Sequence, residues 1–156
     1  MVGIRTSAAR RRGTTTVELA MVAPLLIFLL FGIIEFGLVT RDLIHMNSAA
    51  SQAARLAAVG AGVAELNQAV ADNCVGLNTP DLSTNYQYRH FDMVAATWGS
   101  WQTLTDGAAE AGDQIRIGIT YQHELLFGSW IVRDAGTQEP GRVVLPIRTG
   151  STITRE

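Results

Sequence analysis

The stretch RRRGTTTVELAMVAPLLIFLLFGIIEFG, residues 10–37, places three arginines and a glycine directly before a long apolar run. From Leu19 to Thr40 the only charged residue is Glu35. An α-helix over these residues would be about 33 Å long, enough to cross the roughly 30 Å hydrocarbon core of a bilayer. The sequence therefore predicts one transmembrane helix over residues 14–40.

The placement of arginine predicts the orientation of this helix. Residues 10–12 are all arginine and lie immediately before the span, whereas Arg41 on the far side is followed at once by Asp42. Because flanking arginines are kept on the cytoplasmic side, the N-terminus is predicted to be cytoplasmic and the C-terminal part exported. Residues 1–13 then form a short, basic cytoplasmic leader.

A cleavable Sec signal peptide is an alternative interpretation of the same stretch. The apolar core of such a signal usually spans about 7–15 residues and ends at small residues. The run here is longer, but HMNSAASQAA, residues 45–54, offers small residues. An exported protein with a Sec signal therefore stays open beside the membrane-spanning one.

The residues after the span continue a helical pattern, over residues 41–61. A stripe of mostly small residues recurs there at three- and four-residue steps: Leu43, Met46, Ala50, Ala53 and Ala57. We expect the membrane helix to extend outside the bilayer through this segment, with a kink at Pro24, which lacks the amide hydrogen of a helical residue. The stripe would pack closely against either the protein's own sheet or neighbouring subunits.

The C-terminal part, residues 62–156, shows strand patterns. QIRIGITYQ, residues 114–122, alternates apolar and polar residues, and RVVLPIRTGSTITRE, residues 142–156, does so with Pro146 favouring an edge strand. Shorter candidates are residues 86–91 and residues 97–105, the latter before an Asp-Gly turn. We predict an α+β fold, in which a long membrane-spanning helix continues into a small, exported antiparallel sheet.

Charge argues against one class of partner. Residues 1–40 hold four arginines and two glutamates, a net charge of +2, whereas residues 41–156 hold eight arginines and twelve acidic residues, a net charge of −4. Nucleic-acid binding depends on neutralising phosphates, which an acidic domain does poorly. We therefore predict no nucleic-acid partner.

The residues with chemical potential form no catalytic or metal-binding pattern. The histidines, at 45, 90 and 123, are far apart and in no metal-ligand spacing, the serines lack a nucleophile motif, and Cys74 is the sole cysteine. His90 and Asp92 would share a strand face, which we interpret as a surface pair. The sequence predicts no enzyme, no cofactor, no metal and no small-molecule substrate.

The three tryptophans allow two interpretations. Trp98, Trp101 and Trp130 would suit a binding platform, but large aromatic residues in a small domain usually belong to its core. We expect core positions.

The glutamate at the start of the span also has two interpretations. Thr15 and Glu18 fit a capping box, in which Thr15 caps the helix and Glu18 bonds back to its amide. That interpretation gives no reason for Gly13 or for the arginines before it.

The leader, Gly13 and the glutamate at the fifth position after it resemble the class III signal of type IV prepilins. TVELAMVAPLLIFLLFGIIEFG, NSAASQAARLAAVG and the ending STITRE look more narrowly like the TadE-like proteins of tight-adherence (Flp-type) pilus systems. The resemblance is specific over residues 10–60 and loose beyond. Leu19 departs from the tyrosine or phenylalanine that often follows the glutamate in Flp-type signals.

The resemblance implies a function and a place in the cell. It implies a minor pilin or pseudopilin with a type IV pilin-like fold, cut by a prepilin peptidase between Gly13 and Thr14. Its partners would be the membrane, other pilin or pseudopilin subunits and the pilus assembly machinery. It would reside in the bacterial cytoplasmic membrane and become pilus-associated or extracellular after processing. An uncleaved, membrane-tethered binding module remains the other alternative.

The physical logic of the signal holds independently of the family name. Cleavage would create an α-amino cation at Thr14, and Glu18 lies on the same helix face four residues on. Both charges cost free energy among packed helices unless they pair, so pairing between subunits would set the register of assembly. Glu35, about 26 Å further along the helix, is expected at the outer membrane boundary, as an interfacial residue or a helix contact.

Overall fold

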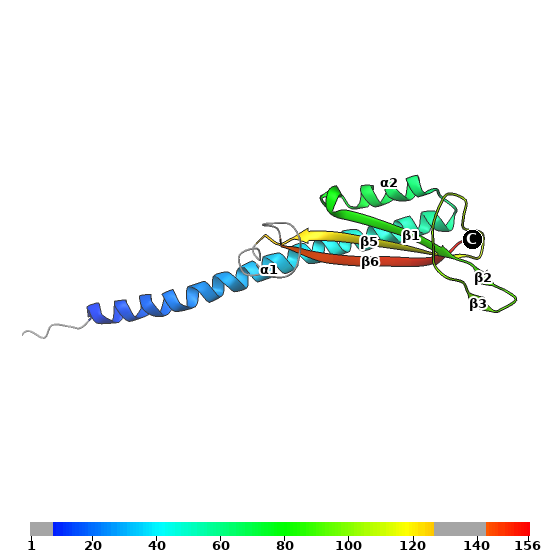
Figure 1. Cartoon of the computed structure of the whole chain (residues 1–156). Helices are drawn as coiled ribbons and strands as arrows, with labels where there is room; N and C mark the ends of the chain where they lie inside the picture. The colour runs from blue at the N-terminus through cyan, green and yellow to red at the C-terminus, as the bar shows by residue number, and fades with distance from the viewer. Residues whose placement is uncertain (1–7, 127–142) are drawn as a thin grey trace, which may run out of the picture. The chain divides into compact units, whose positions relative to one another are not determined.

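The chain divides into two compact units, Met1–Gly37 and Leu38–Glu156, which we call unit 1 and unit 2. The computed structural model describes residues 8–126 and 143–156, with side chains from residue 15 onward. Helix α1 runs from Ala8 to Ala58 and contributes to both units (Figure 1). The predicted α+β layout, a long apolar N-terminal helix followed by a small antiparallel sheet, is confirmed.

The described part of unit 1, residues 8–37, is helical, and its apolar side chains form no core among the described residues. Its large aliphatic and aromatic residues are mostly exposed, from 41% at Ile34 to 76% at Met21. Among the described residues, α1 is the helix that is long and apolar enough to cross a membrane, and its most apolar window is wholly unburied. Such a surface requires apolar surroundings, which the described residues do not supply.

Unit 2 is built around a four-stranded antiparallel sheet in the order β4-β1-β5-β6. Its strands are β1 Leu82–Arg89, β4 Gln102–Thr103, β5 Gln114–Glu124 and β6 Val144–Thr154. A small hairpin pairs β2 Phe91–Asp92 with β3 Thr97–Trp98. The alternating patterns at residues 114–122 and 142–156 thus mark real strands, and Pro146 does lie on an edge strand.

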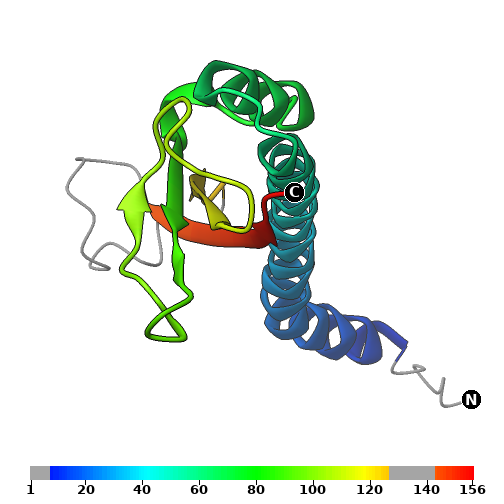
Figure 2. The ribbon, with the colours of Figure 1, turned by 90° about the vertical axis from the view of Figure 1, so that its right-hand side faces the viewer.

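One face of this sheet is covered by α2, Val63–Asn73, and by the part of α1 that belongs to unit 2 (Figure 2). A single cluster joins the buried helix residues to the inward-facing residues of the sheet: Met46, Ala49, Ala50, Ala53, Ala54, Ala57, Leu66, Val70, Tyr86, Tyr88, Ile115, Ile117, Ile119, Tyr121 and Ile147. Alanine lets the helix backbone come close to the sheet. The small-residue stripe therefore packs against the protein's own sheet, although Leu43 is 42% exposed and was wrongly included in it.

The end of α1 is set by a glycine with φ of +82°, Gly60, which follows the helix. The Gly60 amide donates to the Ala57 carbonyl and the Ala61 amide donates to the Leu56 carbonyl, the pair of bonds that defines a Schellman cap. Only glycine adopts this conformation without strain. The C-terminus lies against the same helix end, where the Glu156 amide donates to Ala58.

Helix α2 was not predicted, because residues 62–156 were interpreted as turns and strands. Its apolar residues Val63, Leu66 and Val70 do follow a helical spacing, but the segment is short. The N-terminus of α2 is capped from outside, since the Val63 amide donates to Asp106 Oδ1 at 2.6 Å. A 3-10 turn, η1 at Thr79–Asp81, connects α2 to β1.

The core prediction for the tryptophans is wrong at Trp98 and Trp101. Trp98 is 37% exposed and Trp101 is half-buried, and neither belongs to the core cluster. Both rings instead contact arginine side chains. Trp130 lies outside the described residues.

Candidate processing and assembly site

The predicted cleavage position lies within α1. The helix begins at Ala8, so the Gly13 and Thr14 backbones are already helical in the uncut chain. Thr15 is therefore an interior residue and not an N-cap, and the capping-box interpretation of Glu18 is wrong for this form of the protein. Without the cap, a different reason is needed for a carboxylate at the start of the apolar run.

Glu18 lies one helical turn after Thr14, and its side chain is exposed in unit 1. A carboxylate in the middle of a bilayer costs about 2.5–3.5 kcal/mol on insertion scales, and less near the interface. Glu18 lies near the N-terminal end of the predicted span, where this cost would be modest. The predicted cut after Gly13 would place the new amine of Thr14 one helical turn before this carboxylate.

Pro24 and Glu35 occupy the apolar part of unit 1. Pro24 is exposed and lies inside α1, which continues through it, so a kink at this position stays a prediction. Glu35 is half-buried. Its expected place at the outer membrane boundary is likewise a prediction, because it depends on where the bilayer lies.

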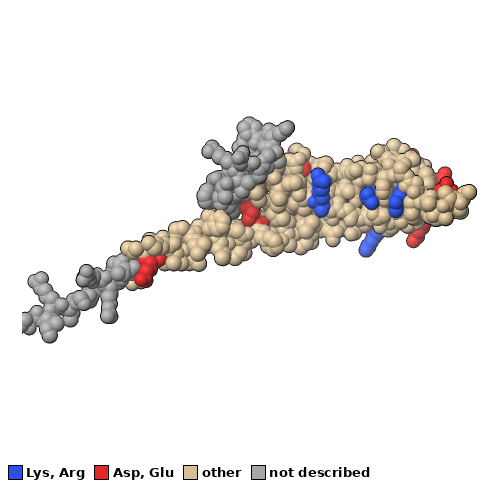
Figure 3. Space-filling view, turned by 60° about the horizontal axis from the view of Figure 1, so that its bottom comes forward, with Lys and Arg blue, Asp and Glu red and all other residues tan. Residues whose placement is uncertain are grey.

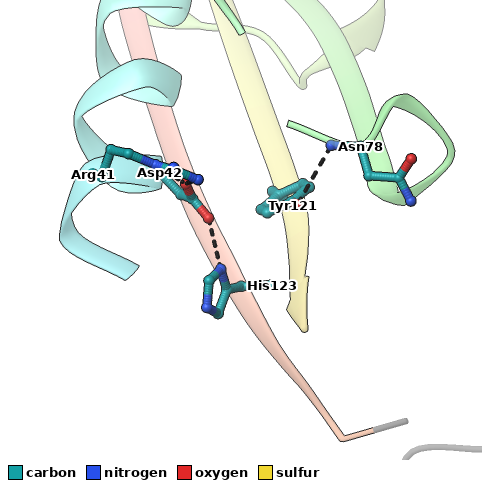
Figure 4. Close-up of polar contacts among 5 residues, drawn as sticks. All are labelled: Arg41, Asp42, Asn78, Tyr121 and His123. Atoms are coloured by element: carbon teal, nitrogen blue, oxygen red, sulfur yellow. Dashed lines mark hydrogen bonds and ion pairs between the residues drawn. The ribbon is translucent and has the colours of Figure 1, made fainter. Parts of the chain in front are cut away.

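Unit 2 contains a polar cluster that sequence reasoning missed, made of Arg41, Asp42 and His123 (Figure 4). The Asp42 carboxylate is buried and lies 2.6 Å, Oδ2 to Nδ1, from the His123 imidazole, which is also buried. Its other oxygen, Oδ1, accepts hydrogen bonds from Arg41 Nε at 3.0 Å and Nη2 at 2.8 Å. Arg41 itself is 54% exposed.

This cluster ties α1 to β5 where the predicted membrane span ends. Tyr121, two residues before His123 on the same face of β5, has its hydroxyl 3.5 Å from the Asn78 amide (Figure 4). Removing one partner of a buried hydrogen bond costs about 1–3 kcal/mol, because it leaves the other group unsatisfied. Asp42 and His123 are distant in sequence, so no local pattern could have paired them.

The predicted surface pair of His90 with Asp92 is wrong. His90 lies 2.6 Å, Nδ1 to Oδ1, from the buried Asp113 and not against Asp92. The amides of Val94 and Ala95 donate to Asp92 Oδ1, which closes the turn of the β2–β3 hairpin and lowers the pKa of that carboxyl. Across the described residues, no three histidine, cysteine or acidic side chains are grouped as metal ligands would be.

The geometry of α1 can now be set beside known proteins. Residues 13–55 match the model of the TadE-like protein family. No curated protein and no solved structure matches the chain. The match confirms the resemblance seen in the sequence.

The extent of the TadE-like match is informative. It begins at Gly13, the residue before the predicted cut, and ends within the unit 2 part of α1. It therefore contains Glu18, the exposed apolar run, Asp42 and most of the buried alanines. The sheet of unit 2 lies outside it, so the TadE-like signature of this chain is a signature of the helix.

Proposed function

We propose that this chain is a minor pilin or pseudopilin that helps to assemble a Flp-type, tight-adherence pilus. The observation that carries the proposal is the TadE-like match over residues 13–55, which starts at the glycine of the leader. The protein acts as a structural subunit and has no catalytic role. Its partners are other pilin or pseudopilin subunits and the assembly machinery.

The exposed apolar surface of unit 1 supports the membrane step of this function. Side chains such as Leu25 and Phe36 are 65% and 74% exposed, and burying apolar surface yields about 25 cal/mol per Å². In the cytoplasmic membrane, lipid covers them, with the N-terminus on the cytoplasmic side. In an assembly, the helices of neighbouring subunits replace the lipid.

Processing by a prepilin peptidase removes the leader. Water adds across the bond between Gly13 and Thr14, leaving a carboxylate on Gly13 and an amine on Thr14. A peptidase needs the bond in an extended form, so the helix from Ala8 must open locally. Glycine lowers helix stability by about 1 kcal/mol relative to alanine, which favours opening at Gly13.

The new amine gives Glu18 its role. The Thr14 ammonium and the Glu18 carboxylate are each costly among packed apolar helices, and pairing offsets that cost. When the two charges belong to adjacent subunits, a shift of the helices separates them. The pair therefore selects one register between neighbouring α1 helices.

Analysis of the N-terminus of the membrane-associated protein tests the proposal. A start at Thr14 is expected. A start at Met1 or Val2 would show an uncleaved, tethered module, and a start near residue 50 would show a Sec-type signal. Either of these results overturns the proposed processing.

A variant of the glycine sharpens this test. Gly13→Leu should retain the leader, so that nearly all protein molecules start at residue 1 or 2, while membrane insertion is unchanged. Ala9→Leu, within the leader, is the matched control and should mature normally. Normal maturation of Gly13→Leu would refute the site.

A further inference from the structure

The outer face of the unit 2 sheet is the face turned away from α1 and α2. Side chains alternate along a strand, and Tyr88, Ile115 and Ile147 point into the core. Their neighbours Arg89, Arg116 and Arg148 therefore point outward, from β1, β5 and β6. Arginine side chains are visible along this side of unit 2 (Figure 3).

Two of these arginines are held in place by a tryptophan. The guanidinium carbons of Arg89 and Arg116 lie 4.5 Å and 4.0 Å from the centre of the Trp101 ring. Arg89 also lies 4.9 Å from the centre of the Trp98 ring and donates to Gln114 Oε1 through Nε at 3.0 Å and Nη2 at 2.7 Å. Stacking fixes a guanidinium plane while its edge stays able to donate hydrogen bonds.

Arg116 and Arg148 have hydrogen-bond donors to spare. Both side chains are exposed, and within the described part of the chain neither forms an ion pair with a carboxylate. Most of the residues around them on this face are amides and hydroxyls, including Gln87, Thr120 and Thr152. The face therefore offers positive charge and neutral polar groups together.

A pair of facing glycines separates the two arginines. Gly118 pairs with Gly150, between the Arg116–Thr152 pair and the Thr120–Arg148 pair. A Cβ at Gly150 would lie 2.9 Å from the Ile117 carbonyl oxygen, so the backbone itself requires glycine there. A Cβ at Gly118 would come no closer than 3.7 Å to another atom, the Asn85 oxygen, so packing gives no reason for glycine.

Glycine inside a strand often marks a place where a ligand comes close to the backbone. The glycine pair leaves a strip of bare backbone across β5 and β6. Arg116 on β5 and Arg148 on the neighbouring β6 lie on the two sides of this strip. Arg148 pairs with Thr120, four residues beyond Arg116, so the two Cα atoms are about 14 Å apart. A ligand that meets both guanidinium groups must be extended.

We propose that this outer face binds a linear polysaccharide that carries carboxylates. Arginine pairs with carboxylate in a bidentate manner, and the amide and hydroxyl side chains bond the hydroxyl groups of sugar rings. The polymer crosses the strip at Gly118 and Gly150, where its rings lie against the backbone. This activity goes beyond the assembly function and does not depend on it.

The same features favour a polysaccharide over single-stranded nucleic acid. Nucleic-acid platforms stack bases on free aromatic faces, whereas Trp98 and Trp101 already stack with arginine. A sugar polymer offers many hydroxyl groups to the amide and hydroxyl side chains of this face.

The test uses the full chain in nanodiscs of zwitterionic lipid, titrated with alginate fragments, which are linear polyuronates. Binding is expected, and Arg116→Gln or Arg148→Gln should weaken it about tenfold each through the loss of a charge-assisted contact. Arg55→Gln removes the same charge from an exposed position of α1 and should leave the affinity unchanged. No binding of alginate, or equal losses for all three variants, overturns the proposal.

A second variant separates binding from folding. Gly118→Thr places a strand-favouring side chain in the bare strip, where its Cβ makes only ordinary van der Waals contacts, so thermal unfolding should occur at the same or a higher temperature. Alginate binding should nevertheless fall at least tenfold. Unchanged binding by this folded variant contradicts the proposed position, and the exposed arginine variants still test the face if Gly118→Thr fails to fold.

Two competing polymers complete the experiment. Polyglutamate carries carboxylates without sugar rings and should bind at least tenfold more weakly than alginate. Equal affinity for polyglutamate would reduce the site to unspecific charge attraction. A single-stranded oligonucleotide that binds more tightly than alginate, with the same arginine dependence, would assign the face to nucleic acid.

Discussion

The two parts of α1 differ in the size and the burial of their apolar side chains, although both are helical. In unit 1 the large apolar residues of the helix are mostly exposed, from 41% to 76%. In unit 2 the buried helix positions are nearly all alanine, with exposures of 0% to 7% from Ala49 to Ala58. Large apolar side chains suit a helix that lies in lipid, and small ones suit a helix that must approach its own sheet.

The difference predicts where a substitution affects the fold of unit 2. All three tryptophans lie in unit 2, so their fluorescence during urea unfolding of the full chain reports on that unit alone. Changes in the unit 2 part of α1 should alter the free energy of unfolding. Changes in the unit 1 part should alter only insertion or assembly.

The largest effect is expected from Asp42→Ala, which breaks the buried contact to His123. Removing the carboxylate leaves both His123 and Arg41 without this hydrogen-bond acceptor and should lower the free energy of unfolding of unit 2 by about 3 kcal/mol. Arg41→Gln is the matched control, because its exposed side chain should contribute less than about 1 kcal/mol. Equal losses for the two variants would show that the buried contact is not the stabilising one.

A smaller loss is expected from Ala53→Leu. Ala53 is fully buried against the sheet, so the larger side chain should overpack the core and cost about 1–3 kcal/mol. In unit 1 the reverse change, Leu26→Ala, should leave urea unfolding of unit 2 unchanged, because Leu26 is 56% exposed. A shift of the unit 2 unfolding transition by Leu26→Ala would contradict the prediction that the unit 1 part of α1 does not affect the stability of unit 2.

Glu18→Ala should have almost no effect on unit 2, within about 0.5 kcal/mol, and should spare membrane insertion. Assembly should be impaired, because the Thr14 amine loses its proposed partner. Co-purification of the protein with pilus subunits measures this effect. Thr16→Ala is the control, because residue 16 lies two positions from both Thr14 and Glu18 and therefore on a different side of the helix. Unchanged co-purification would leave Glu18 without an assembly role.

The smallest effect concerns the single cysteine, at the C-terminal end of α2. Burial raises the pKa of the Cys74 thiol, so the folded state holds its proton more tightly than the unfolded state. Any stability from this group is complete below the unfolded pKa and declines as the pH rises above it. Alkylation by iodoacetamide at pH 8 should be at least about tenfold slower in the native protein than in urea, and equal rates would contradict the burial.

Sequence reasoning succeeded where a local period carries the information. The apolar run, the small-residue stripe and the alternation in residues 114–122 predicted α1 and β5, and the position of Pro146 predicted an edge strand. It failed for α2, whose pattern is short and whose cap comes from Asp106. It also placed Trp98 and Trp101 in the core, because composition does not show which face of a sheet is covered.

The sequence by itself determined the apolar helix, and it predicts the orientation of that helix and the leader signal, since each depends only on neighbouring residues. Only the tertiary structure decided which distant side chains meet. It paired Asp42 with His123, stacked Arg89 and Arg116 on Trp101, and set Gly118 opposite Gly150. The physical reason is that strand register and helix packing, which bring these residues together, are properties of the whole folded core and of no single segment.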